Sequence, residues 1–296
     1  MKKDLNCPYT IIDKDIICEH KLARIDISSI RTLHNHDGYE IVLFLRGDAS
    51  IIVESVEKKL ERGDMVFISP FSFHGLNLNF TDIDKYERIV LNIRYNYLQE
   101  LCDDETDLTV CFHQISPGRP NIIHLSEDAL QQFVSIGDRL EKSINTKQYG
   151  QKLLSRALLS EFMVLACQYM KLSVAANYES IMPAIISNVV EYIEQNISGN
   201  ISVSSIANHL HYNPDYLSRA FKNTTGLSLK HYINAKKCSL AQQYLHQGYS
   251  PYDVCFMIGF NNYSSFSRLF SEIIGCSPKQ YQMKYQCEYC NKLLSL

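Results

Sequence analysis

The 296-residue sequence contains no apolar run long enough to span a membrane and no pattern typical of a secretory signal. The first residues are basic, but Asp13 and Asp15 interrupt the stretch before an apolar core can form. Export and membrane insertion are therefore not expected. We predict a cytoplasmic protein.

Disulfide and zinc frameworks are also absent from the cysteine pattern. Ten cysteines are scattered along the chain, mostly inside apolar periodic segments, where a free cysteine acts as a small hydrophobic residue. Cys287 and Cys290 form a single C-x-x-C near the end, and without a second ligand pair this is a weak zinc signal. This pattern of scattered cysteines is typical of a protein in a reducing compartment.

No strong charge of either sign marks the chain, whose formal net charge is -3. Residues 1–178 carry 20 basic and 25 acidic side chains, and residues 179–296 carry 9 and 7. Such a small basic excess does not by itself indicate a nucleic-acid partner. Any prediction of DNA binding has to depend on residue pattern.

Motifs typical of enzymes are missing as well. The sequence has no glycine-rich phosphate loop, no nucleophile-base-acid arrangement and no second carboxylate placed to act with Glu40. We therefore expect that the chain is not an enzyme and needs no cofactor.

What is present divides the chain into parts of different character. Short runs rich in Ile, Val and Phe, separated by Gly-Asp turns, predict strands of a sandwich or barrel at 39–45, 49–56, 65–70 and 87–93. From Ser126, apolar residues recur at three- and four-residue spacing, which predicts a helical hairpin over 126–172. A small and polar stretch predicts a linker over 173–182.

The remaining chain is predicted to be short helices. Proline at a first helical turn, preceded by a capping residue, marks three starts: Asn213-Pro214, Ser250-Pro251 and Ser277-Pro278. The predicted helices cover about 184–197, 203–210, 214–225, 229–247, 251–258, 262–273 and 278–286.

One residue frame occurs twice in this helical part. SRAFKNTTGLSLKHY at 218–232 and SRLFSEIIGCSPKQY at 267–281 share Ser, Arg, Phe, Gly, Ser and Tyr at matching positions. Each copy predicts a capped short helix, a turn, a second helix and a glycine stop, which is the outline of a helix-turn-helix. The turn holds Gly259 in the second copy but His211 in the first, so we expect slight backbone strain at His211.

The second helix of each copy has a predicted core face and a predicted outward face. An apolar pair four residues apart marks each core face: Leu217 and Phe221, then Phe266 and Phe270. The outward faces carry short polar side chains and arginine, which suit contacts with base edges and phosphates in a major groove. The predicted DNA-binding residues are Asp215, Tyr216, Ser218, Arg219, Lys222, Asn262, Ser264, Ser267 and Arg268. For each arginine, bracing of the fold is an equally good interpretation.

The helix between the two copies sets their separation. Its predicted length corresponds to about 30 Å at roughly 1.5 Å per residue. Adjacent major grooves on one face of B-DNA lie roughly 34 Å apart. One chain can therefore place two recognition helices in adjacent grooves.

On these residues the C-terminal part is similar to the AraC/XylS family of bacterial transcription regulators. The resemblance depends on SVSSIANHLHYNPDYLSRAFKNTTGLSLKHYI and, more specifically, on VCFMIGFNNYSSFSRLFSEIIGCSPKQY. It implies two helix-turn-helix units joined by a long helix, over residues 183–286. Gln282 departs from the family, which commonly has Arg there, so we expect little effect on the fold and one phosphate or bracing contact fewer.

The N-terminal part resembles a cupin barrel in one segment. HNHDGYEIVLFLRG places His34, His36, Glu40 and Gly47 at the cupin spacing, and GDMVFISPFSFH ends at His74. In cupin metalloenzymes the matching residues bind a divalent metal, and imidazole and carboxylate are suitable ligands. The second segment has one extra residue before Pro70 and one fewer before His74, which puts the ligand geometry in question.

Three interpretations of these four residues stay open: hydrogen-bonded ties between strands, the lining of a small-molecule effector pocket, and a metal site. We favour the effector pocket, because the resemblance implies a sensing domain and a small barrel can hold one ligand. A metal-dependent cupin enzyme with an appended helical domain is the alternative for the whole chain.

The sequence therefore predicts an α+β protein of two domains. Residues 1–125 are expected to form a cupin-like barrel, 126–172 a hairpin suited to homodimerisation, 183–286 an all-α double helix-turn-helix domain and 287–296 a tail. The expected partners are double-stranded promoter DNA, a small-molecule effector and a second copy of the chain.

Overall fold

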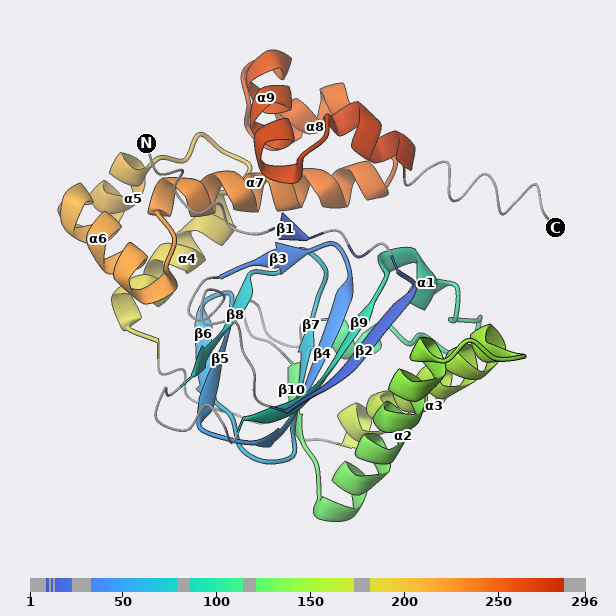
Figure 1. Cartoon of the computed structure of the whole chain (residues 1–296). Coiled ribbons are helices and arrows are strands. Elements are labelled where there is room, and N and C mark those ends of the chain that lie inside the picture. The colour runs from blue at the N-terminus through green and yellow to red at the C-terminus, as the bar shows by residue number, and fades with distance from the viewer. Residues whose placement is uncertain are drawn as a thin grey trace. The chain divides into compact units, whose positions relative to one another are not determined.

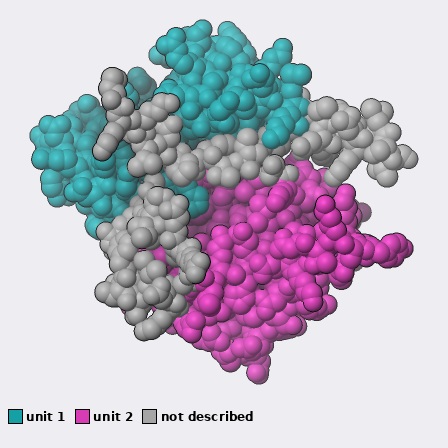
Figure 2. Space-filling view, in the orientation of Figure 1, with its two compact units in different colours: residues 1–9, 32–34, 183–296 teal, residues 10–31, 35–182 magenta. Residues whose placement is uncertain are grey.

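A computed structural model describes residues 9, 10, 12, 14–22, 33–78, 86–113, 121–172 and 182–284. It divides into two compact units, coloured separately in Figure 2. One comprises residues 10–31 and 35–182, called here the β unit, and the other comprises residues 1–9, 32–34 and 183–296, called the helical unit. The linker predicted at 173–182 and the tail pair Cys287 and Cys290 lie, apart from residue 182, outside the described residues.

The strands of the β unit form two antiparallel sheets (Figure 1). The five-stranded sheet has the order β10-β7-β4-β9-β2, and the three-stranded sheet has the order β6-β5-β8. Their bounds are β2 Ile16–Leu22, β4 Tyr39–Arg46, β5 Ala49–Val53, β6 Val56–Lys59, β7 Asp64–Ile68, β8 His74–Leu78, β9 Glu87–Ile93 and β10 Asn121–His124. Two short strands, β1 Tyr9–Thr10 and β3 Asn35–His36, complete the described strands.

Strand β4 separates two hydrophobic cores, because successive side chains of a strand point to opposite faces. Ile41 and Leu43 belong to the core that also contains the helical hairpin. Val42 and Phe44 belong to a second core, shared with β5 residues such as Ile51. The two sheets therefore pack face to face, and Glu40 lies on the face of β4 that looks between them.

The predicted helical hairpin is present as α2 (Glu127–Asn145) and α3 (Gln151–Leu172), which lie along the five-stranded sheet beside β2 (Figure 1). Ser126 is the N-cap, as predicted, and its hydroxyl accepts a hydrogen bond from the Ala129 amide at 3.4 Å. Phe133 and Phe162 join the two helices edge to face, with ring centroids 4.9 Å apart. The apolar faces predicted from spacing thus form one core with the sheet.

The β unit departs from the sequence prediction at its edge strands, its short helices and one turn. The run 49–56, predicted as one strand, is divided between β5 and β6, because the chain turns at Glu54 with a φ of 51°. Strands β2, β8 and β10 and the short helices α1 (Tyr95–Gln99) and η3 (Val110–Phe112) were not predicted. The three strands are at sheet edges and the two helices are short, so their local signal is weak and pairing or packing with distant segments stabilises them.

The helical unit follows the prediction closely. Its helices are α4 Ala184–Asn196, α5 Val203–His209, α6 Pro214–Thr225, α7 Leu229–His246, α8 Pro251–Met257 and α9 Tyr263–Ile274, and a further helical stretch covers 278–284. Each boundary that the caps predicted is within two residues of the observed one. In the described part of the chain, we find no helix that is both long enough and apolar enough to cross a membrane.

Candidate functional site

The helical unit contains two helix-turn-helix units with the same construction. The first helix of each, α5 or α8, begins at a serine N-cap, Ser202 or Ser250. The second helix, α6 or α9, begins at an asparagine N-cap, Asn213 or Asn262, whose side-chain oxygen accepts amide hydrogen bonds. Both second helices end at a glycine in the left-handed conformation, as predicted.

The turn inside each unit has the same hydrogen bonds in both copies. The Tyr212 amide donates to the Ala207 carbonyl at 2.9 Å, and the Phe260 amide donates to the Cys255 carbonyl at 3.0 Å. Between them lie His211 and Gly259, with φ of 58° and 75°. The strain predicted at His211 is therefore confirmed, since side chains other than glycine rarely adopt a positive φ.

The repeated aromatic residues of the frame are structural. Leu217, Phe221, Phe266 and Phe270 are all fully buried, as predicted. Phe221 packs on Tyr232 with ring centroids 5.1 Å apart, and Phe270 packs on Tyr281 at 5.6 Å. The Phe and Tyr residues of the frame thus pack together in the same way in both copies, each in a small core of its own.

The predicted DNA-binding residues lie on the opposite faces of α6 and α9. Asp215, Tyr216, Arg219, Lys222, Asn262, Ser264 and Arg268 are exposed, and Ser218 and Ser267 are half-buried. Three of them make local hydrogen bonds: the Ser218 hydroxyl donates to the Pro214 carbonyl at 2.8 Å, the Asn262 oxygen accepts the Ser265 amide at 2.8 Å, and Arg219 donates within its own helix. The other side chains leave each outward face available for a ligand.

The two frame arginines differ in their surroundings. Arg219 Nε donates to the Asp215 carbonyl one turn earlier, at 3.3 Å. For the exposed Arg268, we find neither an ion pair nor a hydrogen bond with any other described residue. Bracing of the fold is therefore a weaker interpretation for Arg268 than for Arg219.

Helix α7 carries one unit at each of its ends. Tyr232, near its start, packs on α6, whereas Cys238, Ala241 and Leu245 pack on α8 and α9. Its 18 residues span about 27 Å at roughly 1.5 Å per residue. This helix length is comparable to the distance of roughly 34 Å between adjacent major grooves.

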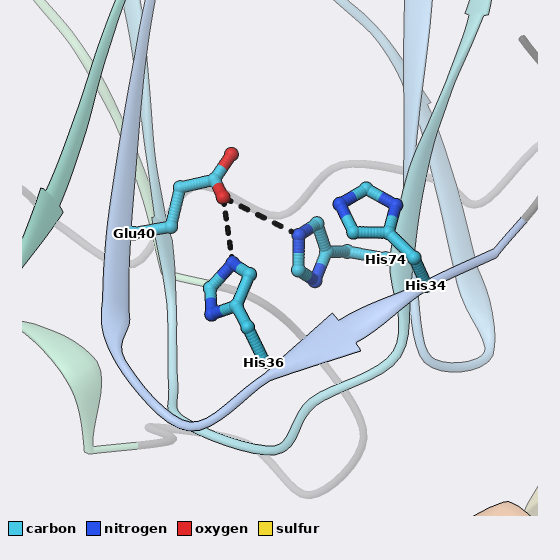
Figure 3. Close-up of side chains that lie close together, drawn as sticks. All are labelled: His34, His36, Glu40 and His74. Atoms are coloured by element: carbon cyan, nitrogen blue, oxygen red, sulfur yellow. Dashed lines mark hydrogen bonds and ion pairs between the residues drawn. The ribbon is translucent and has the colours of Figure 1, made fainter. Parts of the chain in front are cut away.

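In the β unit, three of the predicted site residues converge from separate strands. His36 ends β3, Glu40 is in β4 and His74 begins β8 (Figure 3). Glu40 Oε2 lies 2.7 Å from His36 Nε2 and 3.4 Å from His74 Nε2. His34 also offers a ring nitrogen, and the four potential ligand atoms lie within 4.8 Å of one another.

The inner nitrogens of the two buried imidazoles are held by backbone carbonyls. His36 Nδ1 lies 3.0 Å from the Gly38 carbonyl oxygen, and His74 Nδ1 lies 2.9 Å from that of Ser72. A carbonyl only accepts, so each Nδ1 carries a proton and each Nε2 is directed at Glu40. Carbonyl contacts of this kind orient histidine ligands in metal sites.

Within the cluster, the negative charge of Glu40 and the positive charge of the imidazoles stabilise each other. Burial alone would raise the pKa of Glu40, but the His74 charge and the His36 hydrogen bond outweigh burial and hold this pKa well below its usual range. Burial alone would lower the pKa of His74, but the Glu40 carboxylate raises it. A cation among these groups, whether a proton or a metal, is favourable.

The segment of irregular spacing before His74 contains a turn at Phe71. Phe71 adopts a φ of 66°, and its amide donates to the His36 carbonyl at 2.7 Å. This turn precedes β8, which begins at His74, and His74 Nε2 lies 3.4 Å from Glu40 Oε2 despite the irregular spacing.

Comparison with known proteins points to the same family as the repeated frame. A family model described as a helix-turn-helix domain matches residues 206–284. The HTH-type transcriptional activator RhaR of Pectobacterium carotovorum is 24% identical over 290 residues, covering 94% of both chains. Residues 206–284 are a helix-turn-helix domain of the AraC/XylS type.

Other relatives cover less or resemble the chain less closely. An HTH-type transcriptional regulator of Staphylococcus aureus is 22% identical over 88% of this chain, which spans only 33% of that relative's length. The C-terminal domain of the response regulator AraT from Geobacillus stearothermophilus is 26% identical over 36% of this chain and 88% of its own, with a TM-score of 0.35. ToxT from Vibrio cholerae is 12% identical over 91% of this chain and 97% of its own, also with a TM-score of 0.35.

The departure from the AraC/XylS pattern at Gln282 has a structural role. Its side-chain amide donates to the Tyr249 carbonyl at 2.7 Å, in the loop before α8. A bracing contact is therefore made at this position by glutamine.

Sequence reasoning missed exposed aromatic side chains beside the recognition helices. Tyr252 and Phe256 on α8 are 62% and 46% exposed and pack on each other, and Tyr252 also approaches Tyr263 at the start of α9. Their spacing on α8 looks like an ordinary apolar helix face, so exposure could only be learned from the fold.

Proposed function

We propose that the chain is a sequence-specific DNA-binding transcription regulator of the cytoplasm, with α6 and α9 as its recognition helices. The observation that carries the proposal is the duplication of one helix-turn-helix framework with different outward side chains. Asp215 and Lys222 of α6 have no charged equivalents on α9, which has Ser264 and Ser271 at the matching positions. Two frameworks with different surfaces suit two different subsites on DNA.

Roles on the two faces follow from side-chain chemistry. Arg268 and Arg219 reach guanine edges or phosphates, and Lys222 reaches phosphates. Tyr216, Ser218, Ser264 and Ser267 contact base edges or the backbone beside them. The sequence relatives named above are transcription regulators, which supports this function over a metal-dependent enzyme with an appended helical domain.

DNA binding is tested with the full chain. Duplexes are selected from a random 40-base-pair library, and affinity is measured by fluorescence anisotropy at several salt concentrations. We expect sequence-preferring binding that weakens steeply with salt, because phosphate contacts release counterions. Equal affinity for selected and scrambled duplexes would reject the function.

We further propose that the two sheets form a cupin-like barrel whose effector site is the cluster of His34, His36, Glu40 and His74. Its support is that a carboxylate and oriented imidazoles meet in a buried place, although they come from separate strands. A bound effector alters DNA binding only by its different affinity for two states of the chain. Thermal shift of the full chain during ligand screening tests this, since a ligand of the folded state raises the melting temperature.

A divalent metal ion fits the same cluster and is the second candidate. The donor set of three imidazoles and one carboxylate suits zinc, nickel, cobalt or iron. His36 and His74 would bind through Nε2, because their Nδ1 atoms already face carbonyls. A bound metal would supply a fixed positive charge between Glu40 and the imidazoles and would hold β3, β4 and β8 together.

Homodimerisation through the helical hairpin is the remaining part of the proposal. Helix α3 exposes Leu153, Leu154 and Val164, at 74%, 41% and 37% of their full area. An apolar stripe on a solvated helix is a common dimer surface. Sedimentation of the wild type and a Leu153→Asp, Val164→Asp variant tests it. A wild-type monomer at micromolar concentration would reject it.

A further inference from the structure

Lys237 is a buried cation in the middle of helix α7. It is only 6% exposed, and its ammonium nitrogen lies 2.9 Å from the Gly199 carbonyl oxygen and 2.9 Å from that of Ile258. The ring of Phe260 lies beneath it, with the centroid at 5.1 Å. Among the described residues we find no carboxylate paired with it, so backbone carbonyls and an aromatic face hold the charge.

The two carbonyls belong to different helix-turn-helix units. Gly199 follows the end of α4, the helix that packs on α5 and α6 of the first unit. Ile258 is the C-cap of α8 in the second unit. The Ile258 carbonyl is at the C-terminal end of a helix, where carbonyls are partly negative. The Gly199 carbonyl is in the loop after α4, where it also accepts the Ile201 amide at 3.1 Å. One ammonium therefore binds a carbonyl from each of the two segments.

A second observation brings the same two segments together. A Cβ atom added to Gly259 would lie 2.6 Å from the Ser198 carbonyl oxygen and 2.7 Å from that of Gly199. The turn of the second unit therefore lies directly on the loop that follows α4. Lys237 is at the centre of this contact, with a bond to each side.

We infer that Lys237 is a positioning residue that fixes the distance and rotation between the two recognition helices. The inference rests on the proposed function, because it needs α6 and α9 to bind one DNA duplex. Two linked modules gain on the order of 10²–10⁴-fold in affinity only if their geometry matches the spacing of their sites. Weakening the contact at Lys237 should reduce this gain in affinity and make binding less sensitive to the spacing of the two DNA subsites.

The neighbouring lysine provides a matched control. Lys236 Nζ lies 3.5 Å from Glu194 Oε1, on α4 of the first unit. Both substitutions, Lys236→Met and Lys237→Met, remove one ammonium from adjacent positions of α7 and keep most of the stem. The Lys237 ammonium bonds to carbonyls on both sides of the contact, and the Lys236 ammonium pairs with a carboxylate on α4.

The experiment uses full chains and a duplex selected by the wild type, with its two subsites located by footprinting. A second duplex carries two extra base pairs between the subsites, which rotates one by about 70° relative to the other at roughly 10.5 base pairs per turn. Two further duplexes keep one subsite each. Dissociation constants are measured for the wild type and both variants.

For the wild type and Lys236→Met, we expect the insertion to weaken binding by about ten-fold or more. For Lys237→Met, we expect about ten-fold weaker binding to the selected duplex and less than about a three-fold further loss on insertion. All three proteins should bind the single-subsite duplexes within about two-fold of one another, since each unit keeps its own core. A variant that was merely less stable would keep the wild-type response to spacing.

The outcomes separate the two claims. If Lys237→Met discriminates against the insertion as strongly as the wild type does, the inference is wrong and the proposed function stands. If the wild type selects no DNA sequence, both the proposed function and the inference about Lys237 are wrong. If Lys237→Met loses binding to single subsites, Lys237→Gln replaces it, because its amide can keep one of the two bonds, and an unchanged response to spacing then overturns the inference.

Discussion

The duplicated turn allows one stability prediction to be made twice in the same molecule. Replacing Gly259 by alanine should destabilise the helical unit, whereas replacing His211 by glycine should stabilise it. Both residues have a positive φ, 75° and 58°, between equivalent hydrogen bonds. The difference is that Gly259 lies against the carbonyls of Ser198 and Gly199.

The magnitudes follow from three contributions. A side chain in the left-handed region costs about 1–2 kcal/mol, and glycine costs about 0.5–1 kcal/mol more than alanine in chain entropy. A methyl group forced against backbone oxygens at 2.6 Å and 2.7 Å adds about 1–3 kcal/mol, as in other overpacked sites. We therefore expect Gly259→Ala to lower the free energy of unfolding by roughly 1–4.5 kcal/mol and His211→Gly to raise it by up to roughly 1.5 kcal/mol.

His211→Ala is the matched control, because it places the same residue at the equivalent turn. His211 is exposed, and alanine, like histidine, places a Cβ in the left-handed region, so the change should be small, within about 1 kcal/mol. Urea unfolding of the full chain, followed by circular dichroism, gives the free energies. Hydrogen exchange of peptides from α7 to α9 then shows whether the helical unit is the part affected, since the β unit and the helical unit can unfold separately.

Two results would refute the reasoning. Equal effects of Gly259→Ala and His211→Ala would mean that the close approach of Ser198 and Gly199 contributes nothing. A destabilising His211→Gly would mean that His211 is not strained in the folded state.

Three further predictions concern the two candidate sites and the hairpin. Arg268→Ala should weaken binding to the selected duplex by roughly 1–3 kcal/mol in anisotropy titrations if it contacts a base, and an equal loss on scrambled DNA would instead identify a phosphate contact. His74→Gln should weaken binding of Ni²⁺ to the metal-stripped full chain by at least about ten-fold in calorimetry, and an unchanged affinity would rule out the metal site. His20, whose nitrogens lie 2.8 Å from Asp138 and 3.0 Å from Glu87, has a raised pKa, because the two carboxylates outweigh burial. Its stabilisation, about 1 kcal/mol or less, is thus complete below about pH 6.5 and is lost as pH rises through the raised pKa, so the melting temperatures of the wild type and His20→Gln should differ more at pH 6 than at pH 9.

The helical unit could be predicted almost residue by residue, because its signals are local. Proline after Asn213 or Ser250 and glycine at 226 or 275 determine where helices begin and end through the backbone of those residues alone. The buried Phe and Tyr residues recur at helical spacing. Such information is contained in short windows of sequence.

The β unit was predicted less completely, because strands depend on partners far away in the chain. β10 pairs with β7 across more than fifty residues, and β2 pairs with β9 across a similar distance, so neither edge strand has a strong signal of its own. For the histidine cluster, the spacing of His34, His36 and Glu40 was visible, but the arrival of His74 depended on a turn at Phe71 that spacing did not predict.

The sequence by itself determined two helix-turn-helix units, their caps and the residues on their outward faces, since these follow from helical periodicity and the backbone preferences of Pro, Gly, Ser and Asn. Only the tertiary structure decided what Lys236 and Lys237 do. In the sequence they are one basic pair on a helix, but one ammonium pairs with Glu194 of the first unit while the other is buried between carbonyls of both. The physical reason is that burial and hydrogen bonding of a charge depend on which distant segments pack around it.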